Sequence, residues 1–208
     1  MHIDVTQQLG TVTREVTSRE HNGKPARAVS VSRTYHTTPA DLWDAITTAE
    51  RLPRWFLPLS GDLRLGGRYQ LQGNAGGEIL LCDPPRHLKL TWEYGGTVSW
   101  VEVTIAKHGS GARLTLEHLA HVDKHWEEFG PGAAGVGWDM ALVGLTQHVA
   151  AVEGFTTEAG MQWMMSDNGK AFTRESSDAW TRANVAAGAD PTAAAAAGAR
   201  TTAASTGA

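Results

Sequence analysis

Hydrophobic and polar residues alternate over much of residues 11–119, and this pattern predicts a series of short β-strands. The first two strands cover residues 11–19 and 26–35. Asn22 and Gly23 lie between them, and this pair is typical of a tight hairpin because both central residues of such a turn need a positive φ. Further strands are predicted at residues 68–72, 78–82, 87–94, 97–107 and 112–119. Short strands joined by tight turns favour an antiparallel sheet.

Three segments show helical spacing instead of alternation. Thr38 suits the N-cap of a first helix, Pro39 its first turn, and Asp41 its positive N-terminus. A second, short helix is predicted over residues 50–56. The strongest apolar stripe predicts a long helix over residues 137–152, and a polar, glycine-rich stretch over residues 127–135 precedes it.

The C-terminal end differs in composition from the rest. Helices are predicted over residues 156–172, with a break at 167–169, and over residues 176–187. The last residues are almost all Ala, Thr and Gly, so they cannot form a core alone; they either dock as a helix on the main domain or on a partner, or are disordered. We therefore expect one domain over residues 1–152, with an added N-terminal strand, and a helical, alanine-rich extension over residues 153–208.

Composition excludes several classes of partner and site. The net charge of −4 and the scattered Lys and Arg argue against nucleic acid. A polar N-terminus and the lack of a long apolar run argue against a signal peptide and against a membrane, so we expect a cytoplasmic protein. The single cysteine, Cys82, excludes an internal disulfide, and its strand position predicts a buried, inert thiol. No phosphate loop or nucleophile elbow is present, and no cofactor is expected.

With the order of elements, a set of short motifs resembles the START-like superfamily, also called SRPBCC or polyketide cyclase-like. The motifs occur at residues 38–45, 54–56, 65–69, 77–80, 83–86, 90–93 and 137–138. Within that superfamily the chain is most similar to the bacterial homologues of the heat-shock-protein-90 ATPase activator, over residues 26–152. The resemblance implies an α+β helix-grip fold, in which a curved antiparallel sheet wraps around the long helix and leaves a cavity. It implies no fixed reaction.

Eight tryptophans suggest an aromatic wall for such a cavity, although aromatic residues of this number also suit an ordinary core. By strand parity Trp92 points inward, to the core or to the cavity. Trp55, Trp100 and Trp138 fit either interpretation. The expected ligand-binding residues are Trp55, Phe56, Tyr69, Trp92, Trp100, Leu116, His118, Trp138 and Leu142.

Two titratable residues are candidates for acid or base catalysis. His118 shares strand parity with Leu114 and Leu116, so it either acts in a pocket or is a hydrogen-bonded core histidine. Glu102 is a candidate if Trp100 lines the cavity, but it faces solvent if the neighbouring valines are buried. Residues 118–125 hold three histidines and an aspartate, yet their spacing matches no known set of ligands, and no metal is expected.

Three hypotheses about function remain open. The chain binds a small hydrophobic molecule for sequestration, transport or sensing. Alternatively, it is a cyclase, dehydratase or hydrolase acting on a hydrophobic, polyketide-like substrate through His118 or Glu102. A third hypothesis is an interaction protein, either chaperone-related or protective for its producer, in which methionines of the tail dock on a neighbouring subunit in a possible homodimer.

Overall fold

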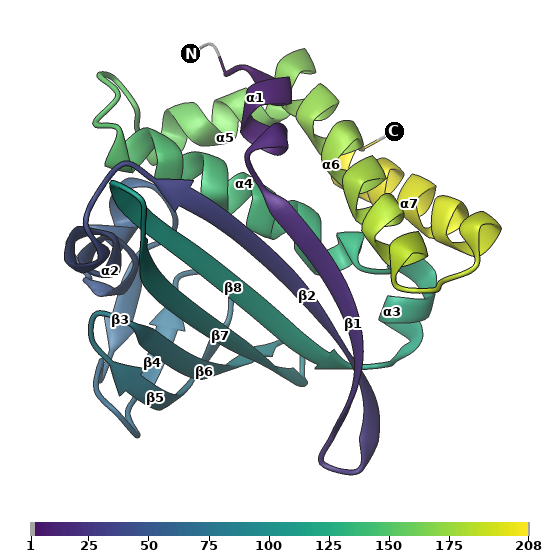
Figure 1. Ribbon diagram of the computed structural model, residues 1–208, viewed down its shortest axis with the longest axis horizontal. Coiled ribbons are helices and arrows are strands. Elements are labelled where there is room, and N and C mark those ends of the chain that lie inside the picture. The colour runs from purple at the N-terminus through teal and green to yellow at the C-terminus, as the bar shows by residue number, and fades with distance from the viewer. Residues whose placement is uncertain (1–2, 208) are drawn as a thin grey trace. The chain divides into compact units, whose positions relative to one another are not determined.

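The chain is an α+β protein. The computed structural model describes residues 3–207, and its eight strands form one antiparallel sheet in the order β1-β2-β8-β7-β6-β5-β4-β3 (Figure 1). The strands are β1 (Thr13–His21), β2 (Lys24–Tyr35), β3 (Leu59–Gly61), β4 (Arg68–Leu71), β5 (Gly76–Asp83), β6 (His87–Tyr94), β7 (Thr97–His108) and β8 (Gly111–His121). Seven of them lie where alternation predicts them. The other, β3, is too short to show alternation.

The helices of the described residues are α1 (Val5–Gly10), α2 (Pro39–Thr47), the 3-10 helix η1 (Leu52–Arg54), α3 (Lys124–Phe129), α4 (Gly132–Val149), α5 (Thr157–Met165), α6 (Asp167–Ala186) and α7 (Pro191–Thr206). The predicted cap of α2 is confirmed, because the Thr38 hydroxyl accepts from the backbone N–H of Asp41 at 3.2 Å. The long helix begins earlier than predicted, at Gly132 instead of residue 137. Before it, Asp123 caps the short helix α3.

Contacts divide the chain into two compact units. The first comprises Met1–Val31, Leu119–Met140 and Glu158–Ala208, and the second comprises Ser32–His118 and Ala141–Thr157. These units do not test the domain boundary predicted at residue 152, which marks the end of the similarity to the START-like superfamily and stays a prediction.

In the first unit the tail docks as helices, which decides between the alternatives left open by its composition. Figure 1 shows α6 and α7 side by side. The Ser177 hydroxyl donates to the carbonyl of Gly198 at 2.9 Å and joins α6 to α7. The Thr201 hydroxyl donates to the carbonyl of Phe129 at 2.8 Å and joins α7 to α3. The alanine-rich segment is therefore an ordered helix that packs on its own chain.

A buried carboxylate connects three elements of the first unit. Asp139 of α4 is 1% exposed and forms an ion pair with Arg14 of β1, whose Nε lies 2.9 Å from Oδ2. From α6, the Ser176 hydroxyl donates to the same oxygen at 2.5 Å and the Trp180 indole N–H donates at 3.1 Å. Burial raises the pKa of Asp139, and Arg14 and the two hydrogen bonds oppose that rise. The ring of Trp180 also fills the space beside Gly135, where a Cβ would collide with it.

In the second unit, α2, η1 and the end of α4 are held together beside the sheet. The indole N–H of Trp55 donates to the carbonyl of Ala45 at 2.9 Å, which joins the segment after η1 to α2. Gly144 of α4 comes so close to that segment that an added Cβ would lie 2.6 Å from the carbonyl oxygen of Trp55. These contacts fix the aromatic residues that follow η1.

Candidate functional site

The pairing of β6 with β7 assigns each side chain to a face of the sheet. Leu90 pairs with Val101 and Trp92 pairs with Ser99, so these four share one face. Because Val101 is buried, we call this the inner face. It also carries Leu88 and Val103.

Aromatic residues gather on this inner face around a small buried cluster. The cluster consists of Leu52, Tyr69, Leu71 and Ile79, and the half-buried side chains of Trp55, Phe56, Leu57, Leu59, Leu88, Leu90 and Trp92 pack against it. The rings of Trp55 and Phe56 stack with centroids 5.5 Å apart. The Tyr69 hydroxyl donates to the carbonyl of Thr91 at 2.8 Å, which satisfies its polar end. Four of the predicted ligand-binding residues therefore meet in one apolar cluster.

One polar pair adjoins the tryptophan of this face. Nε2 of His118 lies 2.8 Å from the Ser99 hydroxyl, and the rings of His118 and Trp92 have centroids 6.0 Å apart. The Ser99 hydroxyl also donates to the carbonyl of Trp92 at 3.1 Å. A carbonyl only accepts, so Ser99 uses its proton there and accepts from Nε2–H of His118. This hydrogen bond places the proton of the imidazole on Nε2.

His118 is a neutral group in this setting. Burial lowers its pKa to about 4, so the ring carries no charge at neutral pH. Leu116 is buried on the same strand and has the same parity as His118. Leu142 of α4 is buried and belongs to the same unit, whereas Trp138 of α4 is half-buried and belongs to the first unit.

Trp100 and Glu102 lie on the opposite face of the sheet. Trp100 pairs with Thr91 and Glu102 pairs with Lys89. These residues alternate with those of the inner face, so their side chains point to the other side of the sheet. The Glu102 carboxylate contacts Nε2 of His87 at 2.7 Å and Nζ of Lys89 at 3.1 Å. Burial raises the pKa of Glu102, but the hydrogen bonds with Lys89 and His87 outweigh it and bring the pKa below its usual value. The structure therefore does not bring Glu102 together with His118, and Glu102 is ionised at neutral pH.

The histidines of the 118–125 segment have separate partners. His121 lies beside His21, with ring centroids 5.8 Å apart, and His125 lies beside Phe129 at 4.9 Å. Asp123 accepts from the N–H of Trp126 as the cap of α3. Within residues 3–207, no three His, Cys, Asp or Glu side chains come together as a group that could hold a metal ion. In the same residues, no helix is long and apolar enough to cross a membrane.

Two features of the site differ from the sequence analysis. Ser99 was not among the candidates, although its parity with Val101 places it on the inner face. Cys82 is exposed rather than buried, because it lies next to the last residue of β5, beyond a register shift between Ile79 and Leu81.

The comparisons with known proteins agree with this fold. The model of the family "Activator of Hsp90 ATPase homolog 1-like protein" matches residues 36–150. The crystal structure of CalU16 from Micromonospora echinospora is 32% identical, with a TM-score of 0.67 over 83% of this chain and 97% of that chain. No curated protein matches the chain significantly.

More distant structures share the fold alone. An HSP90 activator from Plasmodium falciparum is 21% identical, with a TM-score of 0.52 over 60% of this chain and 96% of that one. The Aha1 dimer from Colwellia psychrerythraea is 11% identical, with a TM-score of 0.52 over 61% of this chain and 98% of that one. The chain belongs to the Activator of Hsp90 ATPase homolog 1-like family (AHSA1) of the START-like/SRPBCC superfamily, which confirms the resemblance found in its sequence.

Proposed function

We propose that the chain binds a small hydrophobic molecule in an internal cavity, with the inner face of β6, β7 and β8 as one wall. The proposal includes the helix-grip arrangement, in which the strands of the second unit curve around the end of α4 and Leu142 of that helix faces the ligand. The main observation in its favour is the incomplete burial of Leu88, Leu90 and Trp92. These consecutive inward side chains of β6 are only half-buried, although they pack against a buried cluster.

Protein interiors are normally packed to high density, so large apolar side chains of a core are usually covered. An apolar surface that stays partly accessible, next to a few placed polar groups, is typical of small-molecule sites. Here the polar groups are His118 and Ser99, which are hydrogen-bonded to each other beside Trp92. A neutral imidazole suits such a site because it orients a ligand without requiring a counter-charge.

The proposal is tested by titrating flavone, a neutral and aromatic probe, into the wild type and two matched variants. Trp92→Leu removes an indole from the inner face, and Trp100→Leu removes one from the opposite face of the neighbouring strand. Loss of a large aromatic contact predicts that Trp92→Leu weakens binding by about tenfold or more. Trp100→Leu is expected to leave the affinity within about twofold. Equal effects of the two substitutions, or no binding of flavone by the wild type, would contradict the proposal.

An enzyme is the second candidate, and the neutral state of His118 is the observation in its favour. With a pKa of about 4, the imidazole is neutral at neutral pH; Nε2 carries its one proton, so Nδ1 is the nitrogen that would accept a proton from a bound substrate. Glu102 has no part in this version because it lies on the other face of the sheet. The variant His118→Gln separates the candidates: an enzyme loses turnover of a bound substrate, whereas a binding protein keeps its affinity within about tenfold.

A further inference from the structure

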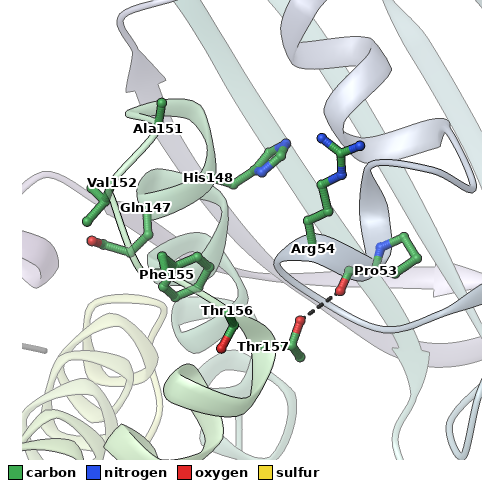
Figure 2. A pocket seen from close by; sticks show the side chains of 9 residues that line it. All are labelled: Pro53, Arg54, Gln147, His148, Ala151, Val152, Phe155, Thr156 and Thr157. Atoms are coloured by element: carbon green, nitrogen blue, oxygen red, sulfur yellow. Dashed lines mark hydrogen bonds between the residues drawn. The ribbon is translucent and has the colours of Figure 1, made fainter.

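A pocket of about 470 Å³ lies in the second unit, between η1 and the end of α4 (Figure 2). We call it the Arg54 pocket. Its lining residues are Pro53, Arg54, Gln147, His148, Ala151, Val152, Phe155, Thr156 and Thr157. The volume lies within the usual range for small-molecule sites. None of the nine residues predicted from the sequence to bind a ligand belongs to this lining, so the pocket is a separate candidate site.

Backbone and side-chain contacts hold the walls of the Arg54 pocket in place. The Thr157 hydroxyl donates to the carbonyl of Pro53 at 2.7 Å, as the dashed line in Figure 2 shows, and this bond ties the segment after α4 to η1. The chain turns sharply beyond α4: Ala151 has a φ of 49°, and the N–H of Val152 donates to the carbonyl of Gln147 at 3.0 Å. The pocket is therefore formed by fixed elements on both sides.

The two arginines at the pocket differ in their partners. Nη1 of Arg51 lies 2.8 Å from Oδ1 of Asp41, so these two charges neutralise each other. Nε of Arg51 also donates to Nε2 of His148 at 3.3 Å. Burial, Arg51 and Arg54 lower the pKa of His148, so its ring is neutral and Nδ1 carries the proton. Arg54 is exposed, and no ion pair found within residues 3–207 includes it, so its guanidinium can pair with an anion in the pocket.

The lining combines the Arg54 guanidinium with an apolar surface. Figure 2 shows the His148 ring of α4 extending toward the Arg54 side chain of η1, and the lowering of the His148 pKa by Arg54 agrees with this proximity. Phe155, Val152 and Pro53 supply apolar area on the same lining. A guanidinium presents a planar fork of N–H donors that matches a carboxylate, and a carboxylate held in this way is bound more strongly than a neutral group.

We propose that the Arg54 pocket binds a small organic carboxylate, with its carboxylate on Arg54 and its apolar body against Phe155 and Val152. His148, fixed by Arg51, supplies a second donor through Nδ1–H. This site is independent of the inner face of the sheet, and its ligand differs in chemistry from the neutral hydrophobic molecule proposed there.

The test compares 1-naphthoate with its neutral analogue 1-naphthamide by isothermal titration calorimetry. The wild type is expected to bind the carboxylate about tenfold more tightly or better, because only the carboxylate pairs with the guanidinium. In Arg54→Gln the two affinities become equal. The control is Arg64→Gln, which removes an exposed arginine of the same unit that is paired with Asp62 away from the pocket. That variant keeps the full preference for the carboxylate.

Further variants separate this site from the inner face and locate the apolar contact. Phe155→Ala is expected to weaken binding of 1-naphthoate by about tenfold, whereas Trp92→Leu leaves the affinity for 1-naphthoate unchanged. Arg54→Gln is expected to fold as the wild type does because the side chain is exposed, and circular dichroism is the check. The proposal is overturned if the wild type binds neither probe or binds both equally, if Arg54→Gln and Arg64→Gln behave alike, or if Trp92→Leu abolishes binding of 1-naphthoate.

Discussion

The buried carboxylate of Asp139 makes a strong prediction about stability. It is the common acceptor for Arg14, Ser176 and Trp180, three residues on two other elements of the first unit. The substitution Asp139→Ala removes this acceptor and leaves the Arg14 side chain, which is 8% exposed, as a buried charge without its partner. Breaking a buried ion pair on one side costs about 3–5 kcal/mol. Because domains are stable by only about 5–15 kcal/mol, we expect a large loss in the free energy of unfolding.

The assay is urea unfolding followed by far-UV circular dichroism, which reports the helices packed around Asp139. The control is Asp62→Ala, which breaks the pair with Arg64 on the surface, where the side chains are 53% and 79% exposed. Exposed pairs contribute about 0–1 kcal/mol, so the control is expected to unfold almost as the wild type does. The reasoning is refuted if Asp139→Ala costs less than about 1 kcal/mol or no more than the control.

Three further predictions concern other parts of the chain. Folding lowers the pKa of His118 from 6.5 to about 4, so the unfolded chain binds the proton more readily than the folded chain does. The free energy of unfolding therefore decreases by about 3 kcal/mol at most as pH falls from 6.5 to 4. Urea titrations at several pH values should show that His118→Gln removes this decrease. In Gly135→Ala the new methyl group collides with the Trp180 ring, which should lower the free energy of unfolding by about 1–3 kcal/mol. Gly137→Ala, on the same helix but with open space around it, should raise the free energy of unfolding by about 0.5–1 kcal/mol. Equal effects of the two substitutions would refute the close approach of Trp180 to Gly135. Met165 of α5 is 77% exposed, and we propose that it lies in a homodimer interface. Light scattering should then give a mass of twice 22.3 kDa for the wild type and of 22.3 kDa for Met165→Glu. An unchanged mass in the variant would contradict this.

Local patterns predict the parts of the fold that local forces determine. The Asn22-Gly23 turn has a positive φ at both residues, and the Thr38 cap forms as expected. The beginning of α4 could not be predicted, because glycine normally disfavours a helix interior. Gly132 and Gly135 occur there because Thr201 and Trp180, distant in sequence, pack against them.

Prediction of the candidate site is limited in the same way. Strand parity is sufficient to place Trp92 on the same face as Leu88 and Leu90. Parity within β7 cannot show which face is buried, so the face of Glu102 is decided only by its pairing with Lys89. The Arg54 pocket depends on the approach of η1 to the end of α4, two segments that are far apart in the sequence, and no local pattern records that approach.

The central claim is that a hydrophobic ligand lies against the inner face of the sheet. Isotope-filtered nuclear Overhauser spectroscopy of methyl-labelled protein with bound flavone tests it most directly. If flavone lies there, its protons show contacts to the methyl groups of Leu88, Leu90 and Leu116. Contacts confined to the methyl groups of Val152, at the Arg54 pocket, or the absence of any contact to the inner face, would contradict it.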